Sequence, residues 1–190
     1  MQELVVATGN PGKLTEMQIY LAETGWQLSL KPPEIDIAET GSTFMENACL
    51  KASQTALATN KWAIADDSGL MVDALGGAPG IYSARYSDTD RGRITKLLNE
   101  LNGQIDRQAQ FVCAIAISQP DGLIVIQATG VCRGEILQTP AGDGGFGYDP
   151  IFYVPAQGVS FAQMSPDLKK QISHRGQAMA EARQKLAALV

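Results

Sequence analysis

The sequence predicts an α/β protein with a mixed β-sheet flanked by helices, for three reasons. Short apolar runs alternate with segments of helical periodicity up to about residue 100. Two consecutive β-branched runs follow in the middle of the chain, which a purely parallel Rossmann winding would not contain. The 190 residues, 45% of them hydrophobic, are enough to bury one core, so we expect a single domain over residues 1–190.

The N-terminal segment predicts a strand, a tight turn and a helix. Residues 4–7 are a short apolar run, and residues 8–12 (TGNPG) are rich in turn formers. Apolar residues then recur at helical spacing as far as Leu21. Residues 26–30 alternate between apolar and polar side chains, as a half-buried strand does.

A capping box predicts where the second helix begins. Thr43 can accept a hydrogen bond from the backbone three residues later, and Glu46 can reach back to the cap. We therefore expect a helix from Phe44 to about Thr59. A buried strand at residues 62–65 follows it, and we expect that strand to stop at the polar residues that come next.

The C-terminal half predicts a hairpin between loops and helices. Residues 73–86 hold three glycines and a proline and should be largely loop, and a helix follows at residues 91–101. Residues 111–118 and 123–128 are β-branched runs joined by a Pro-Asp-Gly turn. The remaining segments are predicted as a third strand of this meander at 131–137, a glycine-rich loop at 142–150 and an alanine-rich helix at 173–189.

The composition excludes several classes of function. A net charge of −5 and a pI of about 4.9 argue against broad binding to a nucleic-acid polymer or an anionic membrane. The apolar runs are far shorter than the roughly 20 residues of a membrane span, and no secretory signal opens the sequence, so we expect a cytoplasmic protein. The three cysteines, Cys49, Cys113 and Cys132, form no CxxC pair and are expected to be buried thiols.

The first segment with chemical potential is the turn after the first strand. A turn that leads from a strand into a helix offers free backbone N–H groups and the positive end of the helix dipole to an anion. Lys13 adds a positive charge there. The segment lacks the spacing of a Walker A loop, and the alternative is an ordinary strand-to-helix turn in which Pro11 starts the helix.

Carboxylates suited to Mg²⁺ occur at two places. Asp66 and Asp67 follow a buried strand, and strand alternation allows only one of them to face a given site. Glu39 offers a second carboxylate, and Mg²⁺ takes a few carboxylates together with phosphate oxygens. Asn47 and Lys51 lie four residues apart on a predicted helix and so share a face. The alternatives are a turn cap, an exposed loop glutamate and solvated helix residues.

A base-binding group is indicated in the C-terminal half. Phe146 stands among glycines that clear space around its ring, and an aromatic ring can stack on any purine. Lys169 and the adjacent His174 and Arg175 can donate hydrogen bonds to a carbonyl oxygen. A generic glycine loop and a structural histidine are the alternatives.

Taken together, these segments closely resemble the inosine triphosphate pyrophosphatase family, the dITP/XTP pyrophosphatases that clear damaged purine nucleotides. The resemblance covers nearly the whole chain and keeps its motifs in order. The matching segments are 5–13 (VVATGNPGK), 39–48 (ETGSTFMENA), 65–70 (ADDSGL), 76–86 (GGAPGIYSARY), 144–152 (GGFGYDPIF) and 173–176 (SHRG).

The resemblance implies an elongated mixed sheet, two lobes with a central cleft, and a homodimer. It implies that Glu39 and Asp67 bind Mg²⁺ and that Asp67 accepts the proton of the attacking water, which leaves Asp66 a structural or supporting role. We further expect Lys13 and Lys51 to offset the charge of the triphosphate. The other substrate contacts that the resemblance implies are Thr8, Gly9, Asn10, Pro11, Gly12, Ser68, Phe146, Gly147, Tyr148, Asp149, Lys169, His174 and Arg175.

The expected reaction is hydrolysis of ITP, dITP or XTP to the monophosphate and pyrophosphate. These bases present a 6-oxo acceptor to donors, whereas adenine would set its amino group against them at a cost of about 1–3 kcal/mol per group. Guanine also carries the 6-oxo group, and the sequence leaves open whether its 2-amino group is excluded sterically or for want of a partner. The competing interpretations are a nucleotide sensor, a P-loop kinase or GTPase, and a pyrophosphatase for modified pyrimidines.

Overall fold

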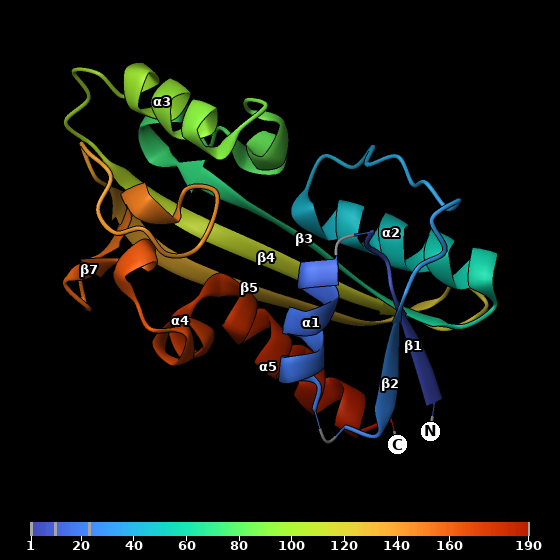
Figure 1. The fold of residues 1–190 in the computed structure, drawn as a ribbon. Helices are drawn as coiled ribbons and strands as arrows, with labels where there is room; N and C mark the ends of the chain where they lie inside the picture. The colour runs from blue at the N-terminus through green and yellow to red at the C-terminus, as the bar shows by residue number, and fades with distance from the viewer. Residues whose placement is uncertain (1, 10, 23, 190) are drawn as a thin grey trace. The chain divides into compact units, whose positions relative to one another are not determined.

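A computed structural model describes residues 2–9, 11–22 and 24–189. It contains a seven-stranded mixed sheet flanked by helices, as the sequence predicts (Figure 1). The strands are β1 (Gln2–Val6), β2 (Trp26–Leu30), β3 (Trp62–Val72), β4 (Gln108–Ser118), β5 (Ile124–Ile136), β6 (Phe152–Val154) and β7 (Val159–Ser160). They pair in the order β2-β1-β3-β4-β5-β6-β7, with β1 parallel to β2 and β3, and β6 antiparallel to β5 and β7.

Helices occupy the segments between the strands. The α-helices are α1 (Pro11–Tyr20), α2 (Phe44–Thr59), α3 (Asp90–Glu100), α4 (Pro166–Ile172) and α5 (His174–Ala187). Short 3₁₀ helices lie at Asp73–Leu75, Gly80–Arg85, Asp149–Ile151 and Phe161–Gln163. Within the part of the chain that the structure describes, no helix has the length and hydropathy needed to cross a membrane.

The chain divides into two compact units. Unit 1 comprises Met1–Asp67, Cys113–Gly130 and Arg175–Val190, and unit 2 comprises Ser68–Val112 and Val131–His174. The single-domain organisation and the central cleft stay predictions. Strands β3, β4 and β5 each contribute residues to both units, and the division of β3 falls between Asp67 and Ser68.

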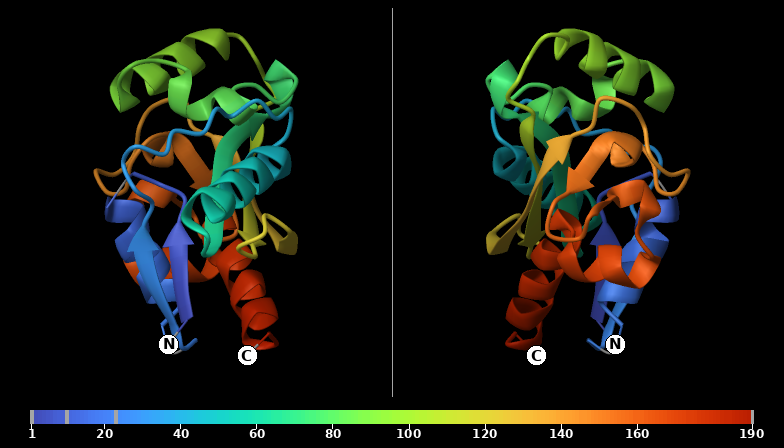
Figure 2. Two further views of the ribbon diagram at one scale, coloured as in Figure 1. Left: turned by 90° about the vertical axis from the view of Figure 1, so that its right-hand side faces the viewer. Right: turned by 90° about the vertical axis from the view of Figure 1, so that its left-hand side faces the viewer.

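The core of unit 1 forms on both faces of its strands. Leu4 and Val6 of β1 pack with Ile64 of β3 and with apolar side chains of α1 and α5. Val5, which points to the other face, packs with Ala56 of α2. The two side views show these three helices beside the strands (Figure 2). Because side chains alternate along β3, Asp66 lies on the same face as Ile64, and Asp67 lies on the opposite face.

Aromatic contacts mark the core of each unit. In unit 1, Trp26 and Trp62 meet edge to face, with ring centroids 5.2 Å apart. In unit 2, Phe111, Phe152 and Phe161 form a buried cluster, with the Phe111 and Phe152 centroids 4.6 Å apart. Such pairs contribute about 0.5–1.5 kcal/mol beyond the burial of their area.

Several predicted elements are confirmed. The helix that begins at Phe44 ends at Thr59, and its capping box is complete, because Thr43 accepts from the Glu46 N–H while Glu46 accepts from the Thr43 N–H. The helix predicted at residues 91–101 is α3, and the helix predicted after the first turn is α1, which starts at Pro11. The strands predicted at 4–7 and 26–30 are β1 and β2.

Other predictions were wrong. Strand β3 does not stop at the acidic pair but continues to Val72, because cationic side chains neutralise both carboxylates and the strand can carry them. The third strand predicted at 131–137 is the continuation of β5, since Thr129 and Gly130 make no turn. The segment predicted as loop at 73–86 holds two 3₁₀ helices, and α4 was not predicted because seven residues show little periodicity.

Candidate active site

Helix α2 brings an amide and an ammonium to Asp67 in unit 1. The Nδ2 of Asn47 donates to Asp67 Oδ2 at 3.2 Å, and one turn later the Nζ of Lys51 donates to Asp67 Oδ1 at 3.1 Å. Lys51 also donates to Glu39 Oε1 at 2.8 Å. Asn47 and Lys51, predicted to share a helix face, therefore both contact the Asp67 carboxylate.

Burial sets the ionisation of this group. Burial raises the pKa of Asp67, the positive charge of Lys51 opposes that rise, and the negative charge of Glu39 adds to it. For Lys51, burial alone would lower the pKa, but the carboxylates of Asp67 and Glu39 raise it above its ordinary value. At neutral pH the Lys51 side chain is thus a protonated ammonium that lies between the carboxylates of Asp67 and Glu39.

Glu39 and Asp67 could together hold Mg²⁺. Glu39 and Asp67 both reach one ammonium, so their oxygens already converge on a single cation. No cluster of three or more His, Cys, Asp or Glu side chains suited to a metal occurs among the described residues. Two carboxylates are sufficient, because Mg²⁺ usually keeps several waters and binds one or two carboxylates together with substrate phosphates.

Asp66 lies on the opposite face of β3 and is almost fully buried. The Nζ of Lys13 lies 3.0 Å from Asp66 Oδ1, and Arg175 Nη2 lies 3.5 Å from Oδ2. Burial alone would raise the pKa of Asp66, but the charges of Lys13, Arg175 and Lys51 outweigh it and hold this pKa far below its usual range. Asp66 is therefore a permanent anion that joins α1 and α5 to the strand.

The predicted phosphate turn lies between β1 and α1. The Thr8 N–H donates to the Val6 carbonyl at 2.8 Å, and Gly9 is exposed. Pro11 and Gly12 form the start of α1, whose backbone N–H groups at this end have no partner within the helix. Asn10 lies outside the described residues. The phosphate contacts predicted here stay predictions.

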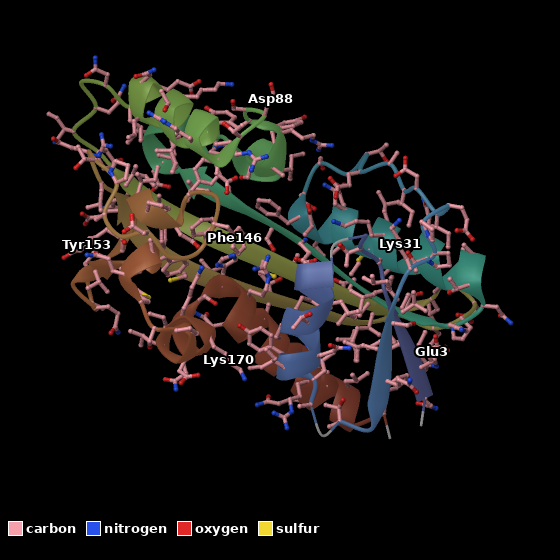
Figure 3. All side chains as sticks on the ribbon, viewed as in Figure 1. Glu3, Lys31, Asp88, Phe146, Tyr153 and Lys170 are labelled. Atoms are coloured by element: carbon pink, nitrogen blue, oxygen red, sulfur yellow. The ribbon has the colours of Figure 1, made fainter. Side chains whose placement is uncertain are left out.

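In unit 2, Phe146 projects from the glycine-rich loop with 62% of its surface exposed (Figure 3). Its backbone N–H donates to Asp149 Oδ2 at 2.8 Å, and the same oxygen accepts from Lys169 Nζ at 2.5 Å. That ammonium lies 5.2 Å from the Phe146 ring centroid. Gly145 has φ +73°, and a Cβ there would come within 2.0 Å of Asp149 Oδ2, so only glycine fits.

Two hydrogen bonds that the sequence did not suggest anchor this loop. The Gly147 N–H donates to Asp90 Oδ2 at 2.8 Å, and the buried Tyr148 hydroxyl donates to the Ser83 carbonyl at 3.0 Å. Tyr148 thus supports the loop from within unit 2. The only local signal for Asp90 was its place in the first turn of a helix capped by Thr89.

The last predicted residues divide between the units. His174 is buried in unit 2 and stacks on Phe111, with centroids 4.7 Å apart and planes 11° apart. Arg175, the next residue, belongs to unit 1 and pairs with Asp66. Ser68 follows Asp67 along β3 and is half-buried in unit 2. Their substrate contacts stay predictions.

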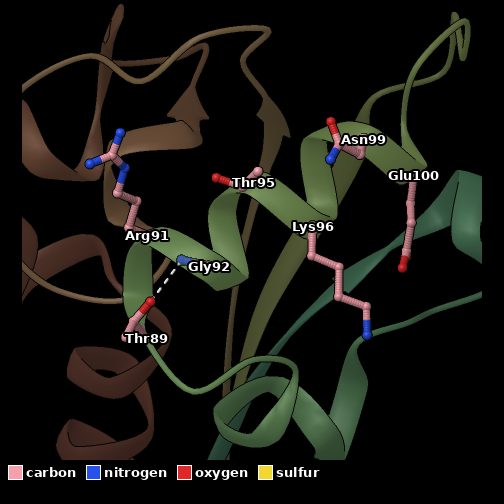
Figure 4. A pocket seen from close by; sticks show the side chains of 7 residues that line it. All are labelled: Thr89, Arg91, Gly92, Thr95, Lys96, Asn99 and Glu100. Atoms are coloured by element: carbon pink, nitrogen blue, oxygen red, sulfur yellow. Dashed lines mark hydrogen bonds between the residues drawn. The ribbon is translucent and has the colours of Figure 1, made fainter.

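Unit 2 also has a surface hollow. It is lined by Thr89 and six residues of α3, and the close view shows their side chains pointing in different directions from one helix (Figure 4). None of the predicted site residues lines it. The predicted site residues thus form a carboxylate group within unit 1 and, separately, an aromatic group within unit 2.

Comparison with known proteins gives consistent matches. A family model described as the Ham1 family matches residues 4–185. The dITP/XTP pyrophosphatase of Nostoc sp. is 63% identical over 187 residues, covering 98% of this chain and 95% of that protein, and the dITP/XTP pyrophosphatase of Synechocystis sp. is 62% identical over 178 residues, covering 94% and 92%. The solved structure of the Staphylococcus aureus Ham1 protein has a TM-score of 0.92 at 45% identity and covers 100% of both chains. That of a HAM1 protein from Coxiella burnetii has a TM-score of 0.94 at 43% identity and covers 99% of this chain and 100% of its own.

Proposed function

Because the chain belongs to the Ham1 family, we propose that it hydrolyses non-standard purine nucleoside triphosphates, namely ITP, dITP and XTP, to the monophosphate and pyrophosphate. The activity removes damaged nucleotides from the precursor pool. The observation that carries the proposal is the convergence of Glu39 and Asp67 on a single cation. The resemblance deduced from the motifs is confirmed by the family match.

Asp67 accepts the proton of the attacking water in this proposal. Burial raises the pKa of this carboxylate, and a carboxylate with a raised pKa is a stronger base than an exposed one. As water forms a bond to phosphorus, the α–β anhydride bond breaks and pyrophosphate leaves. Glu39 and Asp67 would hold Mg²⁺, which when bound neutralises phosphate charge and activates water.

Lys13, Lys51 and the start of α1 would bind the triphosphate. The ion pairs of Lys51 with Glu39 and of Lys13 with Asp66 hold both ammonium groups in place, and their side chains are only 12% and 34% exposed. Each ammonium therefore needs little reorganisation to meet an anion. The backbone N–H groups at the start of α1 add donors suited to phosphate oxygens. Phosphoryl chemistry depends mainly on such positioning and charge neutralisation.

Phe146 and Lys169 would bind the base. The ring of Phe146 is exposed while its backbone is fixed through Asp149, so a purine can stack on it without loop ordering. Lys169 carries donors only, which suit a 6-oxo acceptor and oppose the amino group of adenine. This mismatch supports a preference for inosine and xanthine over adenine.

Replacing Phe146 with Ala is expected to raise KM for dITP by about 5- to 150-fold, because a base loses stacking worth about 1–3 kcal/mol. The value of kcat should change little, since stacking acts equally on substrate and transition state. Steady-state kinetics at saturating Mg²⁺ measures both. Tyr82→Ala, which removes another exposed ring of unit 2, serves as the matched control, and an unchanged KM in Phe146→Ala would contradict the role.

A substrate panel tests the function as a whole. Purified protein with Mg²⁺ is expected to release pyrophosphate from ITP, dITP and XTP much faster than from ATP, GTP or dUTP. Binding without turnover would indicate a nucleotide sensor, and release of γ-phosphate would indicate a kinase or GTPase. Preference for a modified pyrimidine triphosphate would indicate the remaining alternative. We also propose that the protein is cytoplasmic, that it uses Mg²⁺ and, from the resemblance alone, that it forms a homodimer.

A further inference from the structure

Asn47 is a fully buried polar residue next to the carboxylates but outside the set that the motifs assigned to metal or substrate. It lies in the first turns of α2, where most buried neighbours on the helix are apolar or small. A buried amide needs its hydrogen bonds satisfied, because an unsatisfied one costs about 1–3 kcal/mol. Its partners therefore indicate why an amide stands here.

The two ends of the Asn47 amide bind different parts of unit 1. Its Oδ1 accepts from the Gly41 N–H at 2.8 Å, and its Nδ2 donates to Asp67 Oδ2 at 3.2 Å. A backbone N–H can only donate, so the oxygen must face Gly41 and the NH₂ group must face Asp67. The amide thus joins the loop that carries Glu39, two residues before Gly41, to the strand that carries Asp67.

The loop is shaped to permit this contact. A Cβ at Gly41 would lie 2.7 Å from Asn47 Oδ1 and 2.7 Å from the Glu46 Cβ, which is closer than real contacts allow. The neighbouring Ser42 N–H donates to Glu46 Oε2 at 2.6 Å, so the capping box fixes the same stretch of loop to α2. The loop and helix are therefore held together at Gly41, Ser42 and Thr43.

We propose that Asn47 is a positioning residue that fixes the separation of the two metal carboxylates, Glu39 and Asp67. It holds Asp67 through Oδ2, so that Oδ1 stays directed to the point between Asp67 and Glu39 where the Lys51 ammonium lies. It holds Glu39 indirectly, through the backbone of Gly41. This inference rests on the proposed function, because it concerns the same metal site.

The test is Mg²⁺ binding to the protein saturated with a non-hydrolysable dITP analogue, measured by titration calorimetry with MgCl₂. Asn47→Leu keeps the size of the side chain and removes both hydrogen bonds, and we expect it to weaken Mg²⁺ binding by about 10- to 100-fold, as loss of a residue that orients metal ligands does. Because the defect lies in metal affinity, raising Mg²⁺ should recover part of the lost dITP hydrolysis. Gly41→Ala disturbs the other side of the contact and should weaken Mg²⁺ binding in the same direction.

Thr55→Val provides the matched control. Thr55 is equally buried on α2, two turns beyond Asn47, and its hydroxyl has no hydrogen-bond partner among the described residues, so this change alters the helix interior without removing a hydrogen bond. It should leave Mg²⁺ affinity unchanged. If folded Asn47→Leu and Gly41→Ala bind Mg²⁺ like the wild type, Asn47 is merely structural and the inference is overturned. If the wild type itself does not hydrolyse dITP, the proposed function fails instead, and if it hydrolyses dITP without binding Mg²⁺, the inference about Asn47 is overturned.

Discussion

Replacing Asp67 with Asn is expected to lower kcat for dITP hydrolysis by about a hundred- to ten-thousand-fold, the usual loss when a general base is removed. Asn keeps the size of the side chain but cannot accept the proton of water. It also removes one of the two carboxylates that we propose bind Mg²⁺. Pyrophosphate release at saturating Mg²⁺ measures the effect.

The control for this change is Asp121→Asn. Asp121 lies in an exposed turn of unit 1, where its carboxylate accepts from the Leu123 N–H, and asparagine is equally suited to turns. Its rate should equal that of the wild type, and both variants should keep the wild-type circular dichroism spectrum. A folded Asp67→Asn protein that hydrolyses dITP at the wild-type rate would exclude Asp67 as the base.

Replacing Asp66 with Asn is expected to lower the free energy of unfolding by about 2–4 kcal/mol. The change removes a buried anion and deprives Lys13 and Arg175 of its charge, and breaking a buried ion pair from one side is strongly destabilising. The partial exposure of Lys13 places the effect toward the lower end, since its ammonium can turn to water. Urea denaturation at pH 7 measures the difference.

The pH dependence of this difference follows from the direction of the shift. The pKa of Asp66 in the folded protein lies below its value in the unfolded chain, so its stabilising contribution is present above the unfolded pKa of about 3.9. The difference between wild type and Asp66→Asn should stay constant from about pH 6 to pH 8 and shrink only as the pH falls below about 4. Glu3→Gln, which breaks the exposed pair with Lys61, should change stability little and is the control. An Asp66→Asn variant as stable as Glu3→Gln would show that the buried pairs add nothing.

Local rules were sufficient for much of the fold and for part of the site. The capping box of Thr43 and Glu46 needs only neighbours three residues apart, and the helix start follows from it. Strand alternation places Asp66 and Asp67 on opposite faces wherever the strand lies in the sheet. Helical spacing likewise puts Asn47 and Lys51 on one face.

Partners that are distant in sequence could not be predicted in this way. Lys13 and Asp66 are 53 residues apart and Arg175 and Asp66 are 109 apart, so only the sheet topology brings them together. The sequence suggested a phosphate ligand for Lys13 and a base ligand for Arg175, and gave no sign that both hold one anion. The same limit explains why β3 was predicted to stop at charges that tertiary contacts neutralise.

The edge-to-face pair of Trp26 and Trp62 has an optical consequence. These are the two tryptophans of the chain, and both belong to unit 1. Tryptophan emission therefore reports the state of unit 1 alone, whereas far-ultraviolet circular dichroism sums over both units. Recording the two signals on the same denaturation series separates the melting of the half that bears the carboxylates from the melting of the whole chain.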